Sequence, residues 1–583
     1  MQAAYSGAAD PQRELNLDEK AFHDSVAQPF GDGRKTSFVE YVFWADRQRE
    51  REALDKTVVH TAGLSTLVHK IREKGKGGEK TEEAAVQEVQ EVPADDFDDM
   101  VGLSERDIAL ANARRVLRQA GWASVFYLIT CDILGPFSAP YAIAAIGMVP
   151  GILLYILFGA VAALSGVLIS KMFCRLDSHR FPIKMYGDLA ERIFGTPAKH
   201  LCSILQSIQL VLNVGLICLS NGQGLSQIIT GAPGSHTLCF SVCVVIWAIC
   251  GIAIGQIRSL QGIGFLANSS VWLNLLIIFI SMGFIANSAP NYVAAAAEYG
   301  IPAGPNVPTR VVAVVSQPIF AQVNGVFNMV FAYGGAMIFP EIMAEMRRPR
   351  DFIKGMAAAQ LLIFTCYLLY GVFVYAYQGQ YTLALAYQGV SGYAGQTIGN
   401  VLALITGIIA ATLYGNIGLK VFYINIIEGL FRGPPLMSRM GHMIWIPLVF
   451  VYWALAFVVG SAIPSVGTLS GLVAAVCIFQ FTYTFPPALM LGFDIKLDAA
   501  AEDEPWTAPG VTPKQIDTWR NLSRWKRGIF GGGNKRLLYK ALNLLWFLAA
   551  LATAGLGMWA TGTDLRDALQ VTQATSFGCT PPV

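Results

Sequence analysis

The sequence predicts an all-α polytopic membrane protein with eleven transmembrane helices. Of its 583 residues, 54% are hydrophobic and only 14% are charged, whereas soluble domains carry roughly 25% charged residues. Eleven apolar stretches fill the chain from about residue 120 to residue 560, and each has the ~20 residues that a helix needs to cross ~30 Å of hydrocarbon. Two of these stretches are interrupted by glycine and proline at corresponding places in two halves of the chain.

The apolar stretches define spans 1 to 11 in chain order. Span 8 is too long for a simple crossing, so we expect it to tilt or to extend into the cytosol. The predicted ranges are 122–146, 149–173, 201–229, 238–257, 262–286, 324–345, 355–376, 396–430, 443–462, 466–491 and 538–560.

The spans divide the chain into a membrane domain and two tails. Residues 119–562 form the transmembrane domain, and residues 563–583 form a short extracellular C-terminal tail. Residues 1–118 are polar and end in an acidic run, which predicts a cytosolic and largely disordered N-terminal tail. A regulatory tail is the alternative, in which Lys20 or Lys35 would be recognised by the ubiquitin machinery.

Lysine and arginine predict the orientation of the spans. With the N-terminus in the cytosol, the inner loops hold most of the basic residues, and the outer segments contain only Arg310 and Arg566. Positive charge is retained on the cytosolic side of membrane proteins. Eleven crossings then place the C-terminus outside, and we expect the plasma membrane rather than the vacuole.

The interruptions in spans 1 and 6 predict a solute-binding site near the bilayer midplane. Span 1 is broken by the run from Gly135 to Pro140, and span 6 by Tyr333, Gly334 and Gly335. A broken helix in lipid must satisfy its backbone groups in protein or in a watery cavity, and paired breaks in two halves are typical of transporters. Backbone N–H groups suit a carboxylate and carbonyls suit an ammonium, while glycine permits close approach. Kinks that serve only packing are the alternative.

Residues around the breaks are the candidate substrate contacts. The aromatic members would form an apolar wall that favours neutral side chains over lysine or glutamate. Asn213, with Gln209 near it on span 3, would line the cavity or only bond neighbouring helices. Thr412 on span 8 would touch solute or bond back to its own helix. The candidates at the breaks are Gly135, Pro136, Phe137, Ser138, Phe331, Ala332, Tyr333, Gly334 and Gly335.

Ionisable residues within the spans are candidates for ion coupling. Asp132 lies one turn before the first break, and Lys420 lies in span 8, where the two could pair. A charge at such a depth is functional by default, and Thr406 is a further candidate contact. Moving one charge across 100 mV supplies ~2.3 kcal/mol. The spacing leaves H⁺ and Na⁺ open as the coupling ion.

Three motifs in order resemble the amino acid/auxin permease family of transmembrane amino acid transporters. They are 132–151 (DILGPFSAPYAIAAIGMVPG), 186–195 (YGDLAERIFG) and 331–352 (FAYGGAMIFPEIMAEMRRPRDF). The long tail and the span count are similar to fungal neutral amino-acid permeases of the methyltryptophan-resistance type. The resemblance implies the leucine-transporter-like fold of five-plus-five inverted repeats with one extra helix, and it favours H⁺ as the driving ion. Many fungal relatives have histidine where this chain has Ala336.

The leading hypothesis is a secondary active transporter that imports neutral amino acids by proton symport. Alternating access would come from rocking of the two five-helix halves. A non-transporting amino-acid sensor and a vacuolar exporter of the same fold are the alternatives. The sequence shows no nucleophile–base set and no phosphate loop, so we expect neither an enzyme nor a nucleic-acid-binding protein, with no cofactor or metal. Most of the ten cysteines, such as Cys131, lie in apolar stretches, so we expect free thiols.

Overall fold

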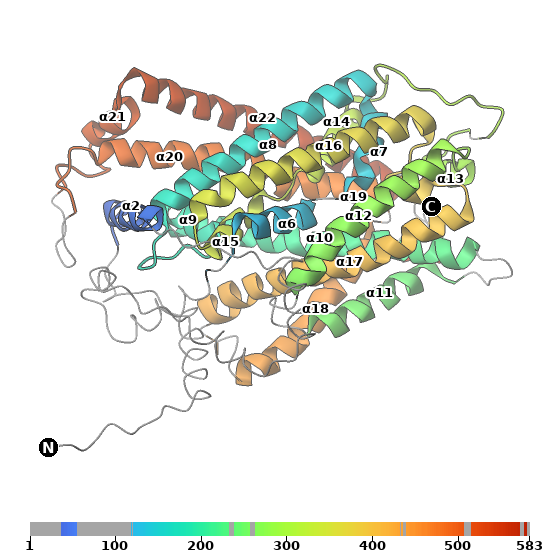
Figure 1. Ribbon diagram of the computed structural model, residues 1–583, viewed down its shortest axis with the longest axis horizontal. Helices are drawn as coiled ribbons and strands as arrows, with labels where there is room; N and C mark the ends of the chain where they lie inside the picture. Colours follow the sequence, from blue (N-terminus) through green and yellow to red (C-terminus); the bar gives the residue numbers. More distant parts are fainter. Residues whose placement is uncertain are drawn as a thin grey trace, which may run out of the picture.

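The computed structural model describes most of the membrane domain and a short piece of the N-terminal tail. The described residues are 36–54, 118, 120–133, 135–231, 238–256, 263–302, 304–431, 433–434, 439–463, 465–506, 515–571 and 577–579. Helices make up the regular structure of these residues, and most run side by side along the long axis of the molecule (Figure 1).

The predicted spans correspond to helices of the structure. Among the described residues, nine helices are long and apolar enough to cross a membrane, and two shorter apolar helices begin at Trp122 and Phe240. The protein is therefore an all-α multi-pass membrane protein, as predicted. Seven spans are single helices: α8 (Met148–Leu176), α10 (Thr196–Gly231), α11 (Phe240–Gly255), α12 (Ile263–Ala286), α16 (Phe352–Gln378), α18 (Arg439–Ala462) and α22 (Gly533–Val571), the last of which is longer than predicted.

The remaining spans are interrupted or change their helical type. Span 8 is α17 (Tyr393–Phe422) followed by the π-helix η7 (Tyr423–Leu430). Span 10 comprises α19 (Val466–Val473), the π-helices η8 (Ala474–Ile478) and η9 (Gln480–Thr484), and α20 (Phe485–Ala499). Span 1 comprises α6 (Trp122–Ile133), η2 (Pro136–Ser138) and α7 (Ala139–Ile146), and span 6 comprises α14 (Ile319–Ala332), η3 (Ala336–Ile338) and α15 (Phe339–Ala344).

The two halves of the bundle interleave. Span 2 (α8) lies against both pieces of span 6, and span 7 (α16) lies against both pieces of span 1. Span 10 packs on span 3, just as span 5 packs on span 8. The contact pattern is thus preserved when spans 1–5 are exchanged with spans 6–10, which is the signature of inverted repeats.

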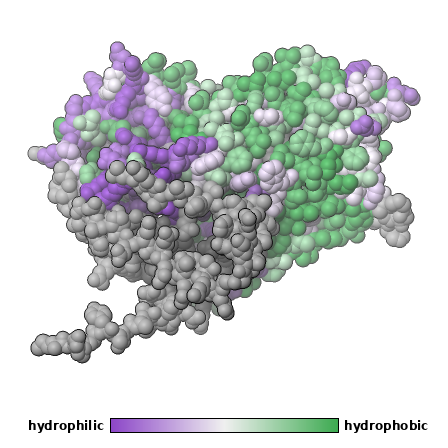
Figure 2. Space-filling model, viewed as in Figure 1, coloured by the Kyte–Doolittle hydropathy of each residue, from purple (hydrophilic) through white to green (hydrophobic). Residues whose placement is uncertain are grey.

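An apolar belt surrounds the bundle. Figure 2 shows hydrophobic residues over the middle of one face and polar residues gathered at the end where α2 (Phe38–Leu54), α20 and α21 (Leu522–Phe530) lie in Figure 1. Large outward side chains such as Leu153, Phe279 and Leu361 are each at least 60% exposed. Such exposure over long helices fits contact with lipid rather than with water.

A helix of the N-terminal tail is anchored to the polar end of the bundle by a buried ion pair. Asp177, directly after α8, is fully buried. Its carboxylate accepts hydrogen bonds from Arg49 of α2 at 2.9 Å, from Arg118 at 2.8 and 3.0 Å, and from the N–H of Ile183 at 3.0 Å. Burial opposes ionisation of Asp177, but these donors outweigh it and hold the pKa of the carboxyl below its usual value.

This helix qualifies the expectation of a largely disordered tail. Residues 38–54 are helical because their apolar side chains find partners on the bundle, including the ring of Phe38 against that of Phe493 at 5.6 Å. Lys20 and Lys35, the candidate targets of the ubiquitin machinery, lie outside the described residues.

One disulfide corrects the expectation of free thiols. Cys239, just before α11, is bonded to Cys579 near the C-terminus, 340 residues away in the sequence. Beside it, the N–H groups of Phe240 and Ser241 donate to Cys579 O and Gly578 O at 3.1 and 3.3 Å. The pair escaped prediction because so long a separation gives no spacing signal; the other eight cysteines are free thiols.

Candidate functional site: two interrupted spans

The break in span 6 is a tight turn closed by its own hydrogen bonds. Because the N–H groups of all three turn residues are occupied in this conformation, the expectation that this break offers them to a carboxylate is not met here. The donor–acceptor pairs are Tyr333 N to Val330 O at 3.1 Å, Gly334 N to Phe331 O at 3.2 Å and Gly335 N to Tyr333 O at 3.0 Å.

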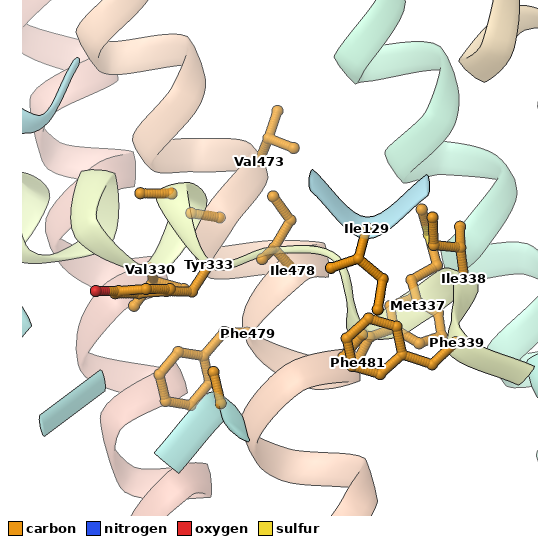
Figure 3. Close-up of a cluster of buried hydrophobic side chains, with 14 of the residues drawn as sticks. Ile129, Val330, Tyr333, Met337, Ile338, Phe339, Val473, Ile478, Phe479 and Phe481 are labelled. Carbon is orange, nitrogen blue, oxygen red and sulfur yellow. The ribbon is translucent and has the colours of Figure 1, made fainter. Parts of the chain in front are cut away.

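Gly334 fits this turn because there is no room for a side chain. An added Cβ would lie 2.8 Å from Ile478 Cγ2 and 3.1 Å from Phe331 O. Ile478 ends the π-helix η8 and is 2% exposed. In Figure 3 it lies between Tyr333 on one side and Ile129 of span 1 on the other. Spans 6 and 10 therefore meet at this break with an apolar contact.

The break in span 1 is more open. Gly135 is exposed, and among the described residues an added Cβ would meet only ring carbons of Phe137, at 3.9 Å. Ser138 precedes α7 as its N-cap residue and makes no capping hydrogen bond with its side chain. The side chain of Pro136 lies outside the described part of the chain. The backbone at Gly135 is therefore accessible to a small solute.

An aromatic pair that the sequence did not reveal flanks the first break. The ring of Phe137 lies edge-to-face against that of Tyr387, with centroids 4.9 Å apart. Tyr387 belongs to η6 (Ala386–Gly389) in the loop between spans 7 and 8, and it is 3% exposed. No sequence periodicity marks a loop residue as the neighbour of a break about 250 positions earlier.

The two breaks belong to one packed unit. The short helix η2 lies against α14 and α16, and α7 packs along α14. Close approach depends on Gly325, where an added Cβ would lie 2.4 Å from Ala145 Cβ. At the other end, the N–H of Ala120 donates to Glu345 O at 3.1 Å, and the N–H of Arg347 donates to Ala120 O at 3.2 Å. The second half of span 1 therefore packs on the first half of span 6, and the start of span 1 is hydrogen-bonded to the end of span 6.

The aromatic residue of the second break is part of the core. Tyr333 is 1% exposed, and its hydroxyl donates to Tyr155 O of α8 at 3.2 Å. Its ring also lies against Tyr367 of α16 at 5.6 Å. Ala332 is buried beside it, while Phe331 is only half-buried. Of the aromatic residues predicted around the breaks, Phe137 and Phe331 are thus the more accessible ones.

Two predicted polar residues on α10 keep open hydrogen-bond acceptors. Asn213 and Gln209 are 6% and 1% exposed. Among the described residues, Asn213 Oδ1 and Gln209 Oε1 are buried without a hydrogen-bond partner. A buried acceptor without a donor is unfavourable, so each is suited to receive a hydrogen bond from water or from a solute.

The predicted threonines bond back to their own helix. Thr412 Oγ1 donates to Ile408 O at 2.7 Å, and Thr406 Oγ1 donates to Ala403 O at 3.2 Å. Back-bonding of this kind is common for threonine within helices. It uses the hydroxyl proton and leaves only the oxygen lone pairs for an ion or a solute.

One of the predicted coupling residues, Lys420, has a carboxylate neighbour on span 6. The carboxylate that acts on Lys420 is that of Glu345, at the end of α15. The backbone of Asp132 lies in α6, but its side chain is outside the described part of the chain. Glu345 is thus a neighbour of Lys420, while the pair between Lys420 and Asp132 stays a prediction.

Paired interruptions within an apolar helical bundle define a multi-pass membrane transporter. Residues 118–499 match the family described as "Transmembrane amino acid transporter protein". This chain therefore belongs to the transmembrane amino acid transporter family.

Fungal proteins are among its relatives. The chain is 23% identical over 474 residues to "N amino acid transport system protein" of Neurospora crassa, covering 80% of this chain and 89% of that protein. It is 22% identical over 385 residues to a "Transmembrane transporter" of Fusarium pseudograminearum, covering 64% of this chain and 75% of that one. A "Transmembrane transporter" of Gibberella moniliformis is 23% identical over 390 residues, covering 65% and 76%.

Proposed function

We propose that this protein imports neutral amino acids by proton symport with alternating access. Membership of the amino acid transporter family supports the substrate class. The observation that carries the proposal is the accessible backbone at Gly135, beside the ends of half-helices in two spans that pack together.

The ends of the half-helices suit the two charges of a free amino acid. The C-terminal end of α14 presents carbonyls with negative partial charge, which suit an ammonium. The N-terminal end of η2 and α7 presents positive partial charge, which suits a carboxylate. Because the N–H groups at Tyr333, Gly334 and Gly335 are occupied, we assign the carboxylate to the first break rather than to both.

The residues around the first break favour an uncharged side chain. Phe137 and Tyr387 are aromatic and lie against each other, and Ser138 follows Phe137 in the chain. A charged side chain placed against these aromatic rings would lose hydration that the rings do not replace. The accessible space therefore supports neutral aliphatic or aromatic substrates.

Alternating access would involve a different division of the bundle from the one that we expected. Spans 3 and 8 (α10 and α17) come from opposite halves and pack along each other. Rocking of the two five-helix halves would have to break this packing. We propose instead that spans 1, 2, 6 and 7, which contact one another across the halves, move against the remaining spans.

The C-terminal disulfide supports the proposed orientation. Cys239 and Cys579 must lie on one side of the membrane because they are bonded. Disulfides persist in oxidising compartments, which supports placing that side away from the cytosol, as we propose for the exterior face of a plasma-membrane protein. The N-terminal tail is then cytosolic, as the positive-inside pattern also predicts.

The proposal also names the coupling ion as a proton, with Na⁺ as the alternative ion. Uptake by purified protein in proteoliposomes tests both substrate and ion, with a panel of labelled amino acids and either a proton or a sodium gradient. We expect accumulation of neutral amino acids when the outside is acidic and none of lysine or glutamate. Accumulation that follows Na⁺ at constant pH would refute proton symport but not amino-acid transport.

Asp132 is the coupling candidate from the sequence. We expect Asp132→Asn to reduce accumulation driven by a pH gradient more than exchange of internal for external substrate. Equal loss of both activities would instead assign Asp132 to structure or to direct solute binding.

A sensor is the second candidate, because α2 of the tail is docked on the cytosolic end through Arg49 and Asp177. Deleting residues 1–115 separates the two functions, since a transporter keeps uptake whereas a sensor loses its output. Deleting residues 1–36, which leaves α2 in place, is the matched control. Fluorescent tagging of the whole chain distinguishes a plasma-membrane importer from a vacuolar exporter.

A further inference from the structure

Besides Asp132 of span 1, a carboxyl group lies in span 6, after the break. Glu341 is in α15, and its Oε2 is buried without a hydrogen-bond partner among the described residues. Its Oε1 accepts hydrogen bonds from Gln206 Nε2 at 2.9 Å and from the N–H of Tyr186 at 3.4 Å. One oxygen of this carboxyl thus accepts two hydrogen bonds, while the other accepts none from the described residues.

The donors come from parts of the bundle outside span 6. Gln206 is in α10 and is fully buried, and its Oε1 also lacks a partner. Tyr186 begins α9 (Tyr186–Phe194), the short helix before span 3. The ionised form of Glu341 therefore attaches α15 to α9 and α10, and protonation removes the negative charge that strengthens these hydrogen bonds.

No basic side chain forms an ion pair with Glu341 among the residues that the structure describes. Its charged neighbour is Asp188 of α9, which is itself paired with Lys199 of α10 at 3.1 Å. Cys202 of α10 is the other titratable group near Tyr186.

The basic residues of α8, the other helix packed on α15, have partners elsewhere. Lys171 lies over the ring of Tyr539 at 5.0 Å, and Arg175 pairs with Asp46 at 3.4 Å. A carboxyl within a membrane span and without a counter-ion is a functional site by default.

We propose that Glu341 binds the transported proton and that its protonation releases α15 from α9 and α10. The release would reach span 1, since the end of α15 is tied to Ala120 by backbone hydrogen bonds. The proton comes from water on one side of the membrane and forms an O–H bond with the carboxylate oxygen; this bond breaks when the proton returns to water on the other side, and no other covalent bond changes. This inference rests on the proposed proton symport and names the group that carries it.

The test compares variants in proteoliposomes with an imposed pH gradient. Wild type accumulates substrate, up to roughly fifty-fold for a driving force equal to one charge across 100 mV. Glu341→Gln keeps the shape of the side chain but cannot ionise, so its accumulation ratio falls to about one while exchange continues. Asp351→Asn, a surface carboxylate paired with Lys354, is the control and keeps accumulation.

A second variant keeps the carboxyl and changes its environment. Gln206→Met removes the closer donor to the ionised form, so the pH at which uptake is half-maximal shifts upward. A purely structural role for the pair would lower uptake without moving this pH. The shift is measurable even if Glu341→Gln fails to fold.

The outcomes separate this inference from the proposed function. If wild type shows no accumulation with a pH gradient, proton symport itself is refuted. If wild type accumulates and Glu341→Gln does as well, or if Gln206→Met leaves the pH profile in place, Glu341 is not the proton carrier and the proposed symport stands.

Discussion

Replacing Gly334 by alanine probes the tight contact between spans 6 and 10. The added Cβ would lie 2.8 Å from Ile478 Cγ2 and 3.1 Å from both Ile478 Cδ1 and Phe331 O. Carbon atoms normally approach to about 3.5–4.0 Å, so the methyl group overlaps neighbours that are buried and, at Phe331, part of the backbone.

The overlap sets the size of the expected effect. Overpacking in a well-packed core costs about 1–3 kcal/mol. Each 1.4 kcal/mol is about tenfold in an equilibrium, so uptake falls roughly 5- to 150-fold if this penalty falls on one state of the transport cycle. Gly334→Val adds two further methyl groups, and we expect it to abolish uptake while the protein still reaches the cell surface.

Gly135→Ala is the matched control from the other break. An added Cβ there lies 3.9 Å from its nearest neighbours among the described residues, so we expect unchanged folding. If substrate lies against this backbone, the methyl group raises KM with little change in maximal rate. The assay is initial uptake at several substrate concentrations, normalised to surface protein. Normal uptake by Gly334→Ala at normal surface amount would refute the reasoning about the second break.

Three further predictions concern the ends of the bundle. Asp177→Asn leaves buried arginines uncompensated and lowers the free energy of unfolding by about 3–5 kcal/mol. Asp46→Asn, in an exposed pair, lowers it by at most about 1 kcal/mol. Thermal unfolding compares the two variants, and equal midpoints would contradict the account. A membrane-impermeant maleimide on intact cells should label Cys239 and Cys579 only after reduction, and labelling only after permeabilisation would reverse the orientation. Burial raises the pKa of Glu298 to about 7, so its contribution to stability falls as pH rises from about 4.5 to 7, and Glu298→Gln should remove that part of the pH dependence.

The spans and their breaks were predictable because few backbone conformations are stable in the hydrocarbon of a bilayer. A long apolar run must be a helix in hydrocarbon, and glycine with proline inside it must interrupt that helix. The structure places the interruptions at η2 and at the turn after α14, where the sequence predicted them. Hydropathy did not predict the end of span 11, because polar residues after position 560 continue the same helix.

The contacts between distant segments were not predictable from one sequence. Tyr387 meets Phe137, and Gln206 meets Glu341, through packing of spans whose partners no periodicity records. The turn at Gly334 was recognised as a break, but its closing hydrogen bonds depend on the backbone angles that the neighbouring spans impose. A threonine such as Thr412 looks the same in sequence whether it faces a solute or bonds to its own helix.

The central claim is that main-chain groups of two interrupted spans hold the zwitterion of a neutral amino acid. A structure of the protein with such an amino acid bound tests it most directly. The account predicts the ligand carboxylate within about 3.2 Å of N–H groups at the first break and its ammonium at the carbonyls that end α14. Ligand bound away from Gly135 and Phe331, or held there only by side chains, would contradict it.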